Sequence, residues 1–225
     1  MEDKAVNKKA LISAVDLVKT FKKVEVIKGL TIDFNKGDRI ALIGQNGAGK
    51  TTLIRCILGQ YVYNGNLSVL GKNPRKYHED LMQHIGFIPQ IPPPLKMTVG
   101  EMLDFFSKLS GKEKKRFTVI GEDLGLDINA NLNKPFLKLS GGMKQKLLVA
   151  LALGRKPEIL LMDEPSANLD PEARKIFFDY LAEYDKDALM IISSHRVKEL
   201  ENLANRVVEM DLGRVVVDKS LVEKN

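Results

Sequence analysis

The sequence contains no tryptophan, a single cysteine and few other aromatic residues. Phenylalanine and tyrosine together make up 6% of the 225 residues, which disfavours a protein that binds nucleic acid by stacking many bases on aromatic rings. The single cysteine, Cys56, excludes an internal disulfide framework and indicates a reducing compartment.

Long hydrophobic runs are also missing. The most apolar stretches, residues 147–153 and 159–162, are far shorter than the roughly 18 to 20 apolar residues that a membrane-spanning helix needs. The first ten residues, MEDKAVNKKA, have neither the apolar segment nor the cleavage site of a secretory signal. We therefore expect a cytoplasmic protein that reaches a membrane only through a surface or a partner.

The composition that remains is that of an ordinary globular protein with an excess of positive charge. Hydrophobic residues make up 44% and charged residues 28%, which argues against disorder. Subtracting 29 acidic from 35 basic residues gives a formal charge of +6. The length fits one domain, or one core with a small subdomain. The charge favours an anionic partner, whether nucleotide, nucleic acid or membrane surface.

Strand and helix patterns alternate along most of the chain. Apolar and β-branched runs predict strands at residues 12–18, 31–34, 39–43, 85–88, 159–162 and 189–193, and around 207–210 and 214–217. Helices are expected at residues 50–58, from Gly142 to about Gly154, and from Pro171. This alternation predicts an α/β core with a parallel sheet.

The middle of the chain, residues 92–137, reads as helical throughout. Thr98 and Glu101 have the spacing of a capping box, which starts a helix. Behind them an apolar stripe recurs at helical spacing, and we expect it to pack in a core: Met102, Phe105, Phe106 and Leu109. With the following helix, these residues predict a small helical subdomain at about residues 92–155.

Residues 44–51, with the sequence GQNGAGKT, match the P-loop pattern G-x-x-x-x-G-K-[ST] between a predicted strand and a predicted helix, and we call this segment the P loop. Glycines allow backbone N–H groups to surround phosphate oxygens at a helix N-terminus. Lys50 would reach the β- and γ-phosphates, and the Thr51 hydroxyl would hold Mg²⁺. The alternative is a glycine-rich turn that matches by accident, with a chance of roughly 1 in 100 for a chain of this length.

The predicted strand at residues 159–162 leads into two carboxylates, Asp163 and Glu164. In a P-loop protein the acid at the end of this strand holds Mg²⁺, which fits Asp163. Side chains alternate along a strand, so we expect Glu164 to point elsewhere and to polarise an attacking water. Without the P loop, the same residues would read as an ordinary junction between a strand and a turn.

Ser140, Gly141 and Gly142 stand at the start of a predicted helix. A hydroxyl, exposed backbone N–H groups and the helix dipole together make a second anion site. The alternative is a simple serine cap preceding two loop glycines, and local physics does not separate the two.

Taken together and in this order, the motifs closely resemble the ATP-binding subunit of ABC transporters over nearly the whole chain. Residues 44–51 look like its Walker A motif, residues 139–145 its signature and residues 159–164 its Walker B motif. Gln90 matches the Q-loop glutamine, residues 166–170 match the D-loop, and His195 matches the switch histidine.

The resemblance also implies the roles of individual residues. It implies that nucleotide is bound by Phe21 at the adenine-stacking position and by Gly44, Asn46, Gly47, Ala48, Gly49, Lys50, Thr51, Thr52, Ser140, Gly141, Gly142 and Asp170. It implies catalytic roles for Glu164, His195, Lys50 and Gln90. Mg²⁺ would be held by Thr51, Gln90 and Asp163.

The implied fold is α/β: a P-loop NTPase core with a RecA-like mixed sheet, flanking helices, an N-terminal antiparallel β part and the small helical subdomain. Residues 1–225 would form one ABC-type ATP-binding domain. The implied function is that of an ATP-hydrolysing motor, in which two copies pair head to tail around two ATP, with ATP and Mg²⁺ as cofactors. The motor drives a separate transmembrane permease subunit, is held by it at the inner face of the cell membrane, and binds no nucleic acid directly.

The cargo is not legible in the sequence. Compact length and the Ser-Gly-Gly-Met signature resemble exporter-type or ABC-2-type systems, including the subunit that serves nitrous-oxide-reductase maturation. The alternative is a soluble ABC ATPase of the iron–sulfur cluster assembly type, which would keep every motif and work with a soluble partner.

Overall fold

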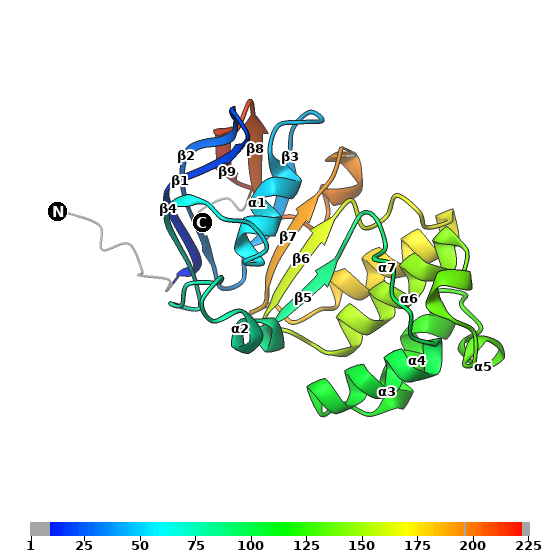
Figure 1. The fold of residues 1–225 in the computed structure, drawn as a ribbon. Coiled ribbons are helices and arrows are strands. Elements are labelled where there is room, and N and C mark those ends of the chain that lie inside the picture. The colour runs from blue at the N-terminus through cyan, green and yellow to red at the C-terminus, as the bar shows by residue number, and fades with distance from the viewer. Residues whose placement is uncertain (1–9, 196, 222–225) are drawn as a thin grey trace.

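Two β-sheets and a group of helices make up the computed structural model, which describes residues 10–195 and 197–221 (Figure 1). The larger sheet is mixed and has the strand order β5-β6-β7-β3-β8-β9. Its strands are β3 (Arg39–Ile43), β5 (Ile85–Ile88), β6 (Ile159–Asp163), β7 (Leu189–Ser193), β8 (Arg206–Asp211) and β9 (Arg214–Ser220). All neighbours pair in parallel except β8 and β9. The predicted mixed sheet is confirmed.

The smaller sheet is antiparallel, with the order β2-β1-β4. Its strands are β1 (Ala10–Phe21), β2 (Val24–Asn35) and β4 (Asn64–Val69). The predicted N-terminal antiparallel part is therefore present, with longer strands than expected and with one strand, β4, that we did not predict. β4 carries two asparagines and a glycine, so its sequence alone does not indicate a strand.

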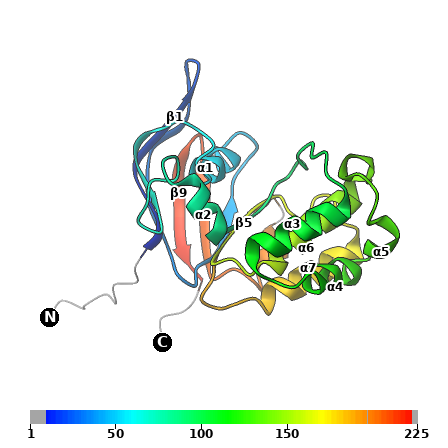
Figure 2. The ribbon, with the colours of Figure 1, turned by 60° about the horizontal axis from the view of Figure 1, so that its bottom comes forward.

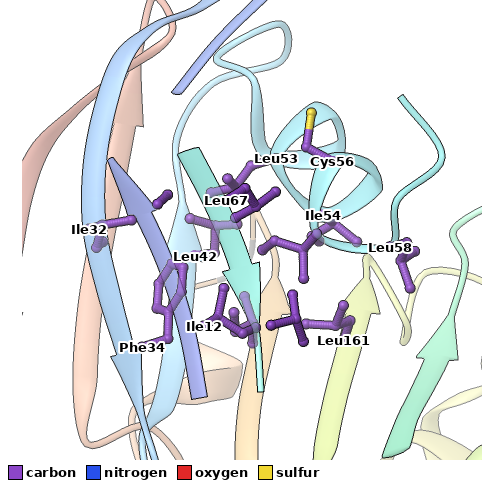
Figure 3. Close-up of a cluster of buried hydrophobic side chains, with 14 of the residues drawn as sticks. Ile12, Ile32, Phe34, Leu42, Leu53, Ile54, Cys56, Leu58, Leu67 and Leu161 are labelled. Atoms are coloured by element: carbon purple, nitrogen blue, oxygen red, sulfur yellow. The ribbon is translucent and has the colours of Figure 1, made fainter. Parts of the chain in front are cut away.

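Helix α1 (Lys50–Ile57) lies between the two sheets. The side chains of Leu53 and Ile54 meet those of Ile12 and Phe34 from the antiparallel sheet and of Leu161 from the mixed sheet in one buried cluster (Figure 3). This apolar contact sets the position of the helix and of the loop that precedes it. The second face of the mixed sheet packs on helix α7 (Pro171–Ala182), so the central strands are buried on both sides.

Most of the remaining helices gather on one side of the molecule, away from the β1–β2 hairpin (Figure 2). They are α3 (Val99–Ser110), α4 (Lys114–Asp123), α5 (Ile128–Asn131) and α6 (Gly141–Gly154), with a short 3₁₀ turn, η1 (Phe136–Lys138). Two short helices lie elsewhere: α2 (His78–His84), which we did not predict, and the 3₁₀ turn η2 (Val197–Leu200).

The boundaries of the helical subdomain, residues 92–155, stay a prediction. Helix α6 contributes Leu147 and Leu151 to the core of the helical part. The same helix contributes Val149 and Leu153 to the core below the mixed sheet. Because α6 contributes to both cores, the packing does not define a boundary between the helical part and the α/β part.

We predicted that the apolar stripe of α3 packs in a core. This is correct for its first residue, Met102, and wrong for Phe105 and Leu109. Met102 is fully buried, whereas Phe105 is 51% exposed and Leu109 is 45% exposed. The buried face instead runs through residues 99, 102, 103 and 106, which have the same helical spacing. The sequence pattern therefore gave the period correctly and the direction of the face incorrectly, since apolar residues occupy both sides of this helix.

Within residues 10–195 and 197–221, no helix combines the length and the apolar character needed to cross a bilayer.

Candidate functional site

The loop of residues 44–49 joins the end of β3 to the start of α1 and depends on its glycines. Gly44 and Gly49 have φ angles of 141° and 107°, which other residues rarely adopt. A Cβ at Gly44 would also lie 2.1 Å from the carbonyl oxygen of Met210. The backbone can therefore turn sharply out of the buried strand and present the N-terminus of α1 to the surface.

Lys50, the first residue of α1, folds back into this loop. Its ammonium Nζ donates hydrogen bonds to the carbonyl oxygens of Gly44, at 2.6 Å, and of Gln45, at 3.1 Å. The residue is only 8% exposed. A buried cation bonded to neutral carbonyls is a strong site for an anion, because a phosphate would neutralise the charge and add charge-assisted hydrogen bonds.

A cavity of about 320 Å³ opens beside this lysine. Residues predicted from the sequence form ten of its eleven lining positions, and Val26 is the other; the lining consists of Val26, Asn46, Gly47, Ala48, Gly49, Lys50, Thr51, Thr52, Gln90, Asp163 and Glu164. The structure thus brings residues from four distant stretches of sequence around one cavity. Val26 gave no chemical signal in the sequence, since a valine in a strand reads as packing.

Asp163 ends strand β6, lines this cavity and is 4% exposed. Its Oδ1 accepts a hydrogen bond of 3.1 Å from the Thr51 hydroxyl and one of 2.6 Å from the Ser193 hydroxyl. With Gln90, these side chains supply carboxylate, hydroxyl and amide oxygens, the hard ligands that suit Mg²⁺. No three His, Cys, Asp or Glu side chains cluster in the described part of the chain. Mg²⁺ does not require such a cluster, since one or two carboxylates and substrate phosphates hold it.

The predicted reason for the direction of Glu164 is wrong. Strand β6 ends at Asp163, so strand alternation does not orient the next residue. Glu164 instead has a left-handed backbone with a φ of 47°, a conformation that is unfavourable for a residue with a side chain. Both acids consequently line the same cavity. The Oε2 of Glu164 lies 2.9 Å from Nδ1 of His195.

Other predicted site residues lie outside the described lining of this cavity. Phe21, which is 38% exposed, packs edge-on against Tyr61 with ring centroids 5.1 Å apart. Ser140 caps helix α6 by accepting a hydrogen bond from the backbone N–H of Met143, so the simple cap is present. A single copy of the chain therefore does not join Ser140, Gly141 and Gly142 to the P loop.

Asp170 also lies away from the cavity. Its Oδ1 accepts a hydrogen bond of 2.9 Å from the N–H of Ala173 and so caps helix α7. Its Oδ2 forms an ion pair of 2.6 Å with Lys146 on α6. The residue thereby connects the start of α7 to the helix that follows the Ser-Gly-Gly sequence.

Two buried polar residues next to the site were missed in the sequence. Ser193 contacts Asp163, as described above. Gln145 on α6 is fully buried, and its Nε2 donates a 3.0 Å hydrogen bond to the carbonyl oxygen of Pro165. Both lie in motifs that the sequence does show, but only the folded chain reveals that they are buried and where they point.

Comparison with known proteins agrees with this geometry. A family model for ABC transporters matches residues 27–167. The linearmycin resistance ATP-binding protein LnrL of Bacillus subtilis is 32% identical, over 92% of this chain and 68% of that protein. The Nod factor export ATP-binding protein I of Rhizobium etli is 31% identical, over 90% of this chain and 66% of that protein.

Solved structures of ABC proteins have the same fold as this chain. The structure of an ATP binding subunit of an ABC transporter superposes with a TM-score of 0.82 at 26% identity, covering 94% of this chain and 90% of that one. A bacterial Atm1-family ABC exporter with ATP bound shares the fold, with a TM-score of 0.81 at 22% identity over 93% of this chain and 38% of that one. The chain therefore belongs to the ABC transporter family, as an ATP-binding subunit whose ATP hydrolysis is coupled to transport.

Proposed function

We propose that two copies of this chain pair head to tail around two ATP molecules and act as the motor of an exporter. The observation that carries the pairing is the separation of two anion-binding features in one chain. Lys50 and the P loop line the cavity, whereas Ser140 caps α6 outside it. Pairing would bring the start of α6 from one copy over the phosphates held by the other.

The site residues have the roles that the family resemblance implies, and the cavity lining supports those of the P loop, Gln90, Asp163 and Glu164. The P loop and Lys50 hold the phosphates, and Thr51, Gln90 and Asp163 hold Mg²⁺, which neutralises charge on the phosphates when bound. Glu164 accepts a proton from the attacking water. His195, which contacts Glu164, contacts the γ-phosphate and keeps the carboxylate in place. Phe21 is 38% exposed and offers its ring for adenine, with the ammonium of Lys19 4.3 Å from the ring centroid.

In the proposed transporter, the two copies of this chain bind a separate transmembrane subunit, which holds them at the cytoplasmic face of the membrane. The name of one relative, the Nod factor export ATP-binding protein I, supports the proposal of export. The formal charge of +6 suits a position beside an anionic lipid surface.

Complementation between two inactive variants tests the pairing. Lys50→Ala disables the P loop and Ser140→Arg blocks the start of α6, so each variant alone should lose ATPase activity. In a head-to-tail dimer, a mixture of the two forms one intact site per mixed pair, which restores about a quarter of the wild-type sites. If the mixture stays as inactive as its components, the head-to-tail arrangement is contradicted.

Purification of the native complex tests the partner. Capture of the tagged chain from detergent-solubilised membranes should yield a multi-spanning membrane protein in a fixed ratio to the chain. Capture of a soluble complex in its place, from cells producing the same tagged chain, would contradict the exporter and favour the iron–sulfur assembly alternative.

A further inference from the structure

We propose that Ser193 is a positioning residue that joins Asp163 and Glu164 into one rigid unit through its hydroxyl. The proposal rests on the roles proposed above for the two acids. Ser193 is the last residue of β7 and is fully buried. In the sheet register it lies directly opposite Asp163, the last residue of β6.

The hydroxyl of this serine accepts one hydrogen bond and donates another. Its hydroxyl donates to Asp163 Oδ1 at 2.6 Å, the short distance expected for a hydroxyl bonded to a carboxylate. The same oxygen accepts a 3.1 Å hydrogen bond from the backbone N–H of Glu164. A hydroxyl has one proton and two acceptor lone pairs, so Ser193 makes both bonds at once. Each bond strengthens the other by polarisation.

Glu164 needs such support because of its backbone. Its φ of 47° is unfavourable for a residue with a Cβ, and surrounding contacts must hold this conformation. The N–H of Glu164 also lies 3.1 Å from the backbone carbonyl oxygen of Ser193. Two acceptors of one serine therefore anchor the strained peptide that sets the direction of the Glu164 carboxylate.

Asp163 receives the complementary restraint. Its Oδ1 accepts hydrogen bonds from both Thr51 and Ser193, so the rotation of the carboxylate is fixed by two hydroxyls from different elements. Outer partners of this kind orient a metal-binding carboxylate, and their removal commonly weakens metal binding 10- to 100-fold. The rest of β7 is apolar, so only the residue opposite Asp163 provides a polar contact to it within this strand.

A matched pair of variants tests whether the hydroxyl matters. Ser193→Thr keeps the hydroxyl, and Ser193→Val has nearly the same shape as the threonine variant without it. Both are made in a Glu164→Gln background, in which turnover does not interfere with binding. We expect Ser193→Val to bind Mn²⁺ about tenfold more weakly than Ser193→Thr in the presence of ATP, as measured by EPR. Binding of ATP without metal should be equal in both.

Turnover provides the second measurement, in chains that keep Glu164. Ser193→Val should lower kcat about tenfold or more relative to Ser193→Thr, with little change in KM for ATP. If thermal melting shows that the larger threonine or valine side chain prevents folding, Ser193→Ala is compared with the wild type instead, because alanine needs no additional space.

Equal Mn²⁺ binding and equal kcat in the valine and threonine variants would overturn the proposal, because the serine would then only fill space. Equal losses in both folded variants would overturn it as well, since size rather than the hydroxyl would matter. Failure of the Glu164→Gln chain with its native Ser193 to bind Mn²⁺ in the presence of ATP would have a different meaning. That result would contradict the proposed metal site, and this proposal with it.

Discussion

His195 and Glu164 meet at 2.9 Å, between Nδ1 of the imidazole and Oε2 of the carboxylate. The Glu164 side chain is 11% exposed and that of His195 is 58% exposed. The contact links the segment after β7 to the residue after β6 at the cavity that contains Lys50. An exposed imidazole and a mostly buried carboxylate are therefore joined at the edge of the cavity.

Replacing Glu164 with glutamine should separate ATP binding from ATP hydrolysis. Glutamine keeps the size of the side chain and its contact with His195, but it is no longer a base. We expect kcat to fall by at least about 100-fold, the usual contribution of a general base, while ATP binding persists and the dimer with bound ATP accumulates. Steady-state ATPase assays and light scattering measure the two effects.

Glu79→Gln is the matched control, since Glu79 is exposed on α2 outside the cavity. It should leave kcat and oligomeric state unchanged. Near-normal hydrolysis by Glu164→Gln would rule out Glu164 as the base.

Lys50→Met should weaken ATP binding directly. Its ammonium is held by the carbonyl oxygens of Gly44 and Gln45, so methionine removes the charge while leaving an unbranched side chain in the same space. Loss of a charged hydrogen bond to phosphate costs about 1.5 to 3 kcal/mol, or roughly 10- to 150-fold in affinity. Titration calorimetry measures the change. Lys108→Met, on the exposed face of α3, should bind ATP as the wild type does, and equal affinity of the two variants would contradict a phosphate contact by Lys50.

Sequence patterns located most of the residues that line the cavity, but not the geometry that joins them. Lys50 and Asp163 stand at fixed places relative to buried strands, so local signals locate them along the chain. The left-handed backbone of Glu164 and the position of Ser193 opposite Asp163 have no local signal. The position of Ser193 results from the register of β6 against β7, which long-range packing determines. Glu164 follows the end of β6, where strand alternation no longer applies.

The same distinction explains the errors in the fold. Strand β4 (Asn64–Val69) has few apolar residues, and its pairing with β1 holds it in the sheet. Phe105 and Leu109 satisfy helical spacing as well as the truly buried residues of α3 do. Periodicity identifies a helix but does not choose between two apolar faces; only the neighbours that pack on it make that choice.

Asp170 offers a test in which a helix cap and an ion pair can be separated. Asp170→Asn keeps a capping side chain and removes the ion pair with Lys146, whereas Asp170→Ala removes both. Loss of a cap costs about 1 kcal/mol of unfolding free energy. The ion pair joins a half-exposed Asp170 to a Lys146 side chain that is 13% exposed, and we expect it to contribute no more than about 1 kcal/mol. Urea unfolding without nucleotide should therefore rank the wild type above asparagine, and asparagine above alanine.

The pH dependence of this ranking follows from the carboxyl group. The N–H of Ala173 and the ammonium of Lys146 lower the pKa of Asp170 below its ordinary value of 3.8. The stabilisation is therefore fully present above pH 3.8 and is lost as the pH falls through the lower pKa of the folded chain. The difference between wild type and Asp170→Asn should shrink in the most acid samples; a difference that grew there would contradict the assigned contacts.

Cys56 should be inert in the folded chain. It is fully buried on α1 and belongs to the apolar cluster that includes Leu53 and Ile54, although its sulfur points away from those two side chains (Figure 3). Burial raises the pKa of its thiol from 9.0 to about 11. Below pH 9 the thiolate fraction is therefore about 100-fold lower in the folded chain than in the unfolded chain, and only the thiolate reacts with disulfide reagents.

We expect labelling of Cys56 to be very slow in buffer, fast in denaturant and absent in Cys56→Ala under both conditions. Because the unfolded chain releases the thiol proton first, the free energy of unfolding should also fall as the pH rises from 9 toward 11. Fast labelling of the folded chain, prevented by ATP, would instead place this thiol within reach of the nucleotide site and contradict its assignment as a core residue.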